Sequence, residues 1–139
     1  MSIPTALSVI ELLQFLRKVR GLEPGERPPA GTFRVAILVS AWDAIDPSWR
    51  AQGPTKWLAQ EMALFEDTLW SNFRREDTFR FGLSSTGGDL RNESYRRDFG
   101  GGGFVEWADS TGVVRHTRDL ALPLYWALFG DLALATARE

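Results

Sequence analysis

An unbroken apolar run, Val35 to Val39, is the feature that most limits how this 139-residue chain can fold. The run contains β-branched residues and does not alternate with polar ones. A strand with one face in water would alternate, so this pattern is typical of a strand that is buried on both faces. We therefore expect residues 32–41 to form a strand that other elements cover from both sides.

Three helices are predicted from apolar side chains spaced three and four residues apart. They span about residues 5–20, 54–75 and 120–137. The first helix has two alternative starts, because Pro4 and the capping pair of Ser8 and Glu11 both fit a helix N-terminus. The last helix is apolar on nearly every side, and one sheet can cover only one of those sides.

Three further strands are expected where short segments alternate apolar and polar residues or flank a turn. They cover about residues 78–84, 103–108 and 112–117, the last two as a hairpin. Residues 85–103 are polar, lack periodicity and contain two glycine groups, which indicates the least structured stretch. The predicted class is α+β, one domain over residues 1–139, with the order α-β-α-β-β-β-α and a mostly antiparallel sheet of about four strands packed against helices.

The composition argues against several classes of function. Sixteen basic residues nearly balance eighteen acidic ones, and the resulting net charge of −2 gives no general attraction to nucleic acid. The chain has no cysteine and one histidine, so we expect no disulfide, no metal site and no cofactor. No apolar segment reaches the roughly 20 residues that cross a bilayer, and the first residues do not resemble a secretory signal. We therefore predict a cytoplasmic protein.

A glycine-rich stretch that follows two arginines is one candidate site. Arg96 and Arg97 precede Gly100, Gly101 and Gly102, and guanidinium groups next to exposed backbone amides bind anions. The stretch leads into a strand and no Gly-Lys-Ser/Thr follows it, so it matches neither a P-loop nor a dinucleotide-binding fingerprint. A flexible hinge or bulge before the strand is the competing interpretation.

Two aspartates and two tryptophans form a second candidate site. Asp43 and Asp46 follow the carboxyl end of the apolar run, where open α/β sheets commonly bind ligands. Such carboxylates can hold a magnesium ion or act as acid and base, although Asp46 before Pro47 is also typical of a turn. Trp42 and Trp49 flank these acids in a loop where no periodic face ensures burial. We predict that the four residues contact a partner.

The sequence gives little support for a catalytic hydroxyl group. Residues 84–89 could place a hydroxyl near an anion, with Ser85 as the nucleophile, but a nucleophile needs a positioned base. The only histidine, His116, lies in a predicted strand, which favours a structural, hydrogen-bonded role. The chain has no Gly-x-Ser-x-Gly elbow. We assign no catalytic residue.

These observations favour a small protein-binding module of the immunity-protein, antitoxin, inhibitor or assembly-factor type, acting by surface complementarity without catalysis. The partner would be another protein or a second copy of the chain, because the apolar side chains exceed what one sheet can cover. The alternative is a small enzyme or ligand-binding domain that binds an anionic metabolite through the arginine- and glycine-rich loop.

Overall fold

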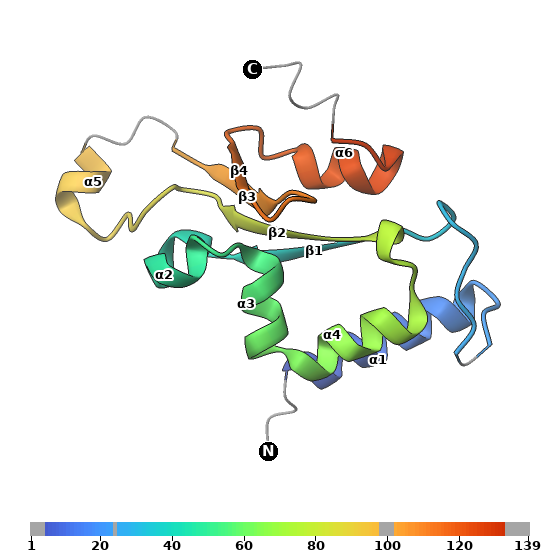
Figure 1. Ribbon diagram of the computed structural model, residues 1–139. Helices are drawn as coiled ribbons and strands as arrows, with labels where there is room; N and C mark the ends of the chain where they lie inside the picture. Colours follow the sequence, from blue (N-terminus) through green and yellow to red (C-terminus); the bar gives the residue numbers. More distant parts are fainter. Residues whose placement is uncertain (1–4, 24, 98–101, 133–139) are drawn as a thin grey trace.

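A four-stranded sheet lies at the centre of the structure (Figure 1). The structure is a computed structural model, and it describes residues 5–23, 25–97 and 102–132. The strands, in their order across the sheet, are β1 (Val35–Ser40), β2 (Thr78–Ser84), β3 (Phe104–Ala108) and β4 (Val114–Thr117). β1 and β2 are parallel, whereas the other two pairs are antiparallel. The predicted α+β class is confirmed. The sheet, which was predicted to be mostly antiparallel, is mixed, because one of its three strand pairs is parallel.

Helices cover both faces of this sheet (Figure 1). One face carries α1 (Thr5–Val19), α3 (Pro54–Glu61) and α4 (Ala63–Asn72), and the other carries α6 (Leu122–Phe129). Apolar clusters lie on each side because side chains of a strand alternate between the two faces. The cluster under α1 and α4 consists of Leu13, Phe65, Leu69 and Phe73, with Val35 and Ile37 of β1. The cluster under α6 consists of Phe81, Val105, Trp107, Leu122 and Trp126.

Two of the predicted helices differ from the observed ones. The helix expected over residues 54–75 is divided at Met62, whose φ of −134° is not helical, and the two halves pack in different clusters. A short helix, η2 (Arg75–Asp77), follows. The last helix ends at Phe129, because Gly130 adopts a left-handed conformation with φ of 70° that closes the helix. Residues 133–137 of the predicted helix lie outside the described residues.

Short helices also occupy segments that were expected to be irregular. The connection after β1 contains η1 (Trp42–Ala44) and α2 (Pro47–Arg50). The polar segment after β2 contains α5 (Glu93–Arg97), so it is not wholly without regular structure. In the part of the chain that the structure describes, no helix has the length and apolar character needed to span a membrane.

The environment of β1 departs from the sequence prediction. β1 is an edge strand, and Leu38 near its middle is 47% exposed. The expectation of a strand covered on both faces is therefore only partly met, because α6 does not reach over Leu38. The helix α1 shows a similar departure, since Leu13 is buried while Leu12, Leu16 and Val19 on its apolar stripe are exposed.

A buried arginine connects α1 to the rest of the molecule. Arg17 is 2% exposed, and its guanidinium donates to the carbonyl oxygens of Asn72 at 2.7 Å, Glu23 at 3.2 Å and Glu26 at 2.5 Å. Burial lowers the pKa of Arg17 from its usual value, and the charge of Glu26 partly opposes this effect. The side chain thus satisfies the carbonyl at the end of α4 and two carbonyls of the loop after α1.

Replacing Arg17 with methionine is expected to lower the free energy of unfolding by about 2 kcal/mol, because three carbonyl oxygens lose their donor while the aliphatic packing is largely kept. Urea denaturation followed by tryptophan fluorescence measures this change. The matched control is Lys18→Met on the exposed side of α1, which should change the stability by less than about 0.5 kcal/mol. Equal effects of the two substitutions would contradict the role given to Arg17.

Candidate functional site

The carboxyl ends of β1 and β2 lie at the same edge of the sheet, because the two strands are parallel (Figure 1). Ser40 pairs with Leu83 at the last step of the ladder, so the segments that follow the two strands start next to each other. After β1 comes η1, and after β2 comes a loop that we call the 84–88 loop. Open sheets with parallel strands commonly bind ligands at this position.

A sharp turn at Ala41 directs Trp42 onto β2. Ala41 has φ 53° and ψ 39°, a left-handed conformation that is uncommon for a residue with a side chain. The Trp42 indole has no exposed surface and lies against Gly82, where an added Cβ would be 2.4 Å from the ring. Trp57 packs edge-on to it, with 6.3 Å between ring centroids. Trp42 is thus a core residue that determines where Asp43 lies.

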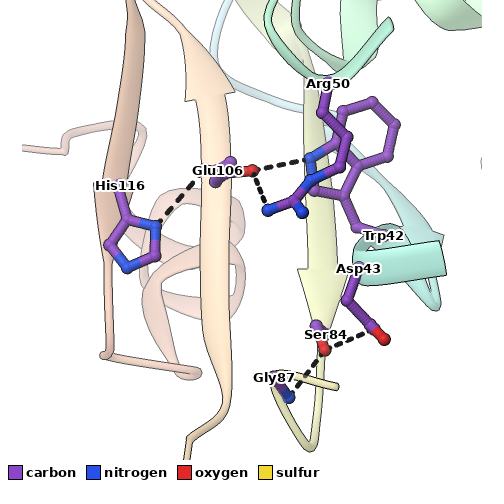
Figure 2. Close-up of polar contacts among 7 residues, drawn as sticks. All are labelled: Trp42, Asp43, Arg50, Ser84, Gly87, Glu106 and His116. Atoms are coloured by element: carbon purple, nitrogen blue, oxygen red, sulfur yellow. Dashed lines mark hydrogen bonds and ion pairs between the residues drawn. The ribbon is translucent and has the colours of Figure 1, made fainter. Parts of the chain in front are cut away.

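Asp43 and Ser84 connect the two loops through a hydrogen bond (Figure 2). The Ser84 hydroxyl donates to Asp43 Oδ1 at 2.5 Å and accepts the backbone N–H of Gly87 at 2.8 Å. Ser84 is fully buried and Asp43 is half-buried, so the hydroxyl holds the carboxylate and the 84–88 loop in one arrangement. Among the hydrogen bonds of the described residues, Asp43 accepts one from a side chain, that of Ser84 to Oδ1.

The 84–88 loop is shaped by glycine and by the neighbouring α5. Gly87 has a φ of +77°, and a Cβ at this position would lie 2.0 Å from the carbonyl oxygen of Gly102. The Tyr95 hydroxyl of α5 donates to the carbonyl oxygen of Thr86. The backbone N–H groups of Ser85 and Thr86 make no turn or loop hydrogen bond in the described part of the chain. Both residues directly follow Ser84, whose hydroxyl is bonded to Asp43.

Glu106 of β3 holds three polar side chains that come from different elements (Figure 2). Its Oε1 accepts from Trp42 Nε1 at 2.9 Å and from Arg50 Nη2 at 3.1 Å, and its Oε2 lies 3.3 Å from His116 Nδ1. The Arg50 guanidinium also lies over the Phe104 ring, 5.1 Å from its centroid. This network orients the Trp42 indole. Because Asp43 follows Trp42 in the chain, the network also helps to position Asp43.

The corner at the carboxyl ends of β1 and β2 contains hydrogen-bonding groups from two loops. Asp43 supplies an oxygen acceptor, and Ser84 connects it to the loop that carries the backbone N–H groups of Ser85 and Thr86. No group of three or more His, Cys, Asp or Glu side chains capable of holding a metal ion occurs among the described residues.

The four residues predicted to contact a partner lie in different environments. Trp42 is fully buried, Asp43 lies at the corner described above, and Trp49 is half-buried in α2. Asp46 caps α2, because it accepts the Ser48 hydroxyl at 2.6 Å and the Ser48 N–H at 2.9 Å. These two hydrogen bonds hold the pKa of Asp46 below its usual value. Contact of the four residues with a partner stays a prediction, and Trp42 has no exposed surface to offer.

The predicted anion site lies partly outside the described residues. Arg96 and Arg97 are exposed on α5, and Arg97 pairs with a glutamate one turn earlier at 3.0 Å. Gly100 and Gly101 fall among the residues whose structure is not described. Gly102 lies against the 84–88 loop. An anion site at these arginines and glycines stays a prediction.

In the sequence, Asp43 and the serines after β2 are separate features, and no sequence pattern indicates a role for Glu106 or Arg50. The signal that would have joined them is the parallel pairing of β1 and β2, because both strands end in polar segments. A mostly antiparallel sheet gave no reason to bring the two carboxyl ends together.

A comparison with known proteins assigns the chain to a family. Residues 1–127 match the family model described as Double-GTPase 1, which is most of the chain. No curated protein and no solved structure matches the chain.

Proposed function

Because the chain belongs to the Double-GTPase 1 family, we propose that Asp43 and the 84–88 loop bind the guanine base of GTP. The observation that supports this function is the corner at the carboxyl ends of β1 and β2, where Ser84 holds the Asp43 carboxylate next to the loop at 2.5 Å. We propose recognition of the base only, and not hydrolysis.

The chemistry of guanine is complementary to this corner. The edge of guanine presents two neighbouring donors, N1–H and the exocyclic amine, followed by the acceptor O6. The Asp43 carboxylate accepts from both donors, since Ser84 occupies only one position on Oδ1. Adenine presents an unprotonated N1 at the same place, and its lone pair repels a carboxylate. A carboxylate at this position therefore favours guanine over adenine.

The backbone donors of the 84–88 loop complete the recognition of the base. In this proposal the backbone N–H groups of Ser85 and Thr86 donate to O6, and an N–H group accepts no hydrogen bond from the adenine amine. Tyr95 and Gly102 pack against the loop and keep these donors in place. Donors that are already oriented lose little entropy when the ligand binds.

The test is a change of base preference in Asp43→Asn. We expect the wild type to bind GTP and to bind ATP far more weakly, and the variant to lose about 30-fold in GTP affinity, or about 2 kcal/mol. An asparagine amide donates one hydrogen bond and accepts another, which matches xanthine, whose C2 carbonyl replaces the guanine amine. The variant should therefore prefer xanthosine triphosphate. Isothermal titration calorimetry with the three nucleotides measures these affinities.

The matched control is Asp67→Asn, which removes the same charge from an exposed position on α4. This variant should bind GTP like the wild type. Equal affinity of the wild type for GTP and ATP, or an unchanged GTP affinity in Asp43→Asn, would contradict base recognition at this corner.

Protein binding is the second candidate function, and exposed apolar side chains support it. Leu12, Phe15 and Val19 of α1 are 55%, 62% and 66% exposed, and Leu124, Leu128 and Phe129 of α6 are similarly uncovered. A surface of this kind is typical of contacts with another chain. Among the described residues, no observation favours an immunity protein, an antitoxin or an inhibitor in particular.

A further inference from the structure

The structure has a sheet edge that is open and uncharged, and we propose that β1 pairs through this edge with β1 of a second copy of the chain. β1 is the first strand in the order β1-β2-β3-β4, and within the described residues only β2 pairs with it. One side of the strand therefore presents backbone N–H and C=O groups without a strand partner. Such an edge pairs readily with another strand.

The two edges of the sheet differ in how they are protected. At the opposite edge, β4 presents the exposed side chains of Arg115 and His116. Charged side chains on an edge strand discourage pairing with another chain. β1 has the sequence VAILVS, without a single charged residue. The chain thus protects one edge against pairing and leaves the other without such protection.

A groove runs beside the open edge and adds apolar surface to it. Its volume is about 520 Å³, and β1 forms one wall. The other wall is made by helix residues that include Leu13 of α1, Trp57 and Met62 of the α3 segment, and Phe65 of α4. No charged side chain lines the groove. An occupant must therefore be an uncharged strand whose side chains fill an apolar space.

The second copy is the occupant that fits this description, because β1 itself is such a strand. Two copies related by a two-fold axis place β1 antiparallel to β1, with Leu38 opposite Leu38 of the second copy at the centre of the pairing. Every residue from Val35 to Ser40 then faces an uncharged residue, so no like charges meet. Both copies satisfy their edge groups in the same way, which is typical of a two-fold interface.

The first experiment measures the mass of the purified chain by size-exclusion chromatography with light scattering. We expect a mass twice that of the 15.6 kDa chain at concentrations of tens of micromolar. Leu38→Lys brings two positive charges to the centre of the pairing and should weaken the dimer at least about 100-fold, so that the variant runs as a monomer. Leu38 is partly exposed in the single chain, so this lysine leaves the fold intact, which circular dichroism verifies.

The matched control is Val113→Lys, which adds the same charge next to β4 at the other edge. Val113 is 51% exposed, close to the 47% of Leu38. This variant should remain a dimer. A monomeric wild type, or a Leu38→Lys variant that dimerises as strongly as the wild type, would overturn the proposal and leave a foreign strand as the remaining occupant.

A second experiment uses the absence of cysteine from the chain. Leu38→Cys introduces a single thiol near the two-fold axis, and mild oxidation should join two copies through a disulfide. Val113→Cys introduces an equally exposed thiol away from the pairing and should form little disulfide-linked dimer under the same conditions. Equal crosslinking of the two variants, read on a non-reducing gel, would place the interface elsewhere and reject pairing through β1.

Discussion

Gly82→Ala is expected to destabilise the fold by about 3 kcal/mol, because its methyl group would meet a buried ring that cannot move away. A Cβ at Gly82 would lie 2.4 Å from Cγ of Trp42. The Trp42 indole is fully buried and donates to Glu106 at 2.9 Å, and the left-handed Ala41 fixes its backbone. Denaturation by urea, followed by far-UV circular dichroism, measures the loss.

The same substitution should also weaken nucleotide binding, since a displaced Trp42 moves Asp43 away from Ser84. We expect the GTP affinity of Gly82→Ala to fall at a temperature where the variant is still folded. A double-mutant cycle with Trp42→Leu identifies the cause, because the cost of the added methyl should become smaller once the large ring is removed. A cost that is the same in both backgrounds would show that the clash lies elsewhere.

A second glycine separates steric conflict from backbone strain. An added Cβ at Gly21 meets nothing within 4 Å, although φ is +78° at this residue. Gly21→Ala should therefore cost only about 1 kcal/mol, the price of a left-handed conformation for alanine. A larger cost for Gly21→Ala than for Gly82→Ala would contradict the importance of the contact with Trp42.

Glu66→Gln is the other substitution with a large expected effect, about 3 kcal/mol of lost stability. The carboxylate of Glu66 in α4 accepts two hydrogen bonds from Arg80 in β2, at 2.8 Å and 3.0 Å, and both side chains are nearly inaccessible to solvent. Arg80 also donates to the Thr78 hydroxyl and lies over the Trp70 ring. Neutralising the glutamate leaves a buried guanidinium without its counter-charge, which is costly in an apolar surrounding.

The matched variant replaces both partners, Glu66→Met together with Arg80→Met. Removing both charges removes the desolvation cost along with the attraction, so the double variant should be more stable than Glu66→Gln alone. Chemical denaturation of the two variants in parallel measures their free energies of unfolding. A double variant that loses more stability than the single one would show that the ion pair itself contributes a large net stabilisation.

Much of the secondary structure followed from local patterns in the sequence. The spacing of apolar residues predicted α1 and α6. The apolar run predicted a strand over residues 32–41, within which β1 lies. Glycine and proline marked the ends of several elements, as Gly130 does for α6. Local patterns did not reveal the break at Met62 or the short helix α5, because neighbouring core clusters and the 84–88 loop decide those features.

The candidate site was only partly predictable for a similar reason. Asp43 was identified from its place after a strand, whereas its partner Ser84 lies 41 residues away in the sequence. The burial of Trp42 depends on Gly82 and on Glu106, 64 residues away. No periodic pattern links positions so distant, so the sequence did not show that Trp42 is buried.

By itself, the sequence determined the helices α1 and α6, the strands, the α+β class and the acidic residue at the end of β1, because these depend on the conformational preferences of neighbouring residues. Tertiary structure alone decided that β1 and β2 run parallel, that β1 lies at an open edge, and that Ser84 meets Asp43. Those features depend on which distant surfaces pack together, and packing is selected by the free energy of the whole molecule, which a short segment does not contain.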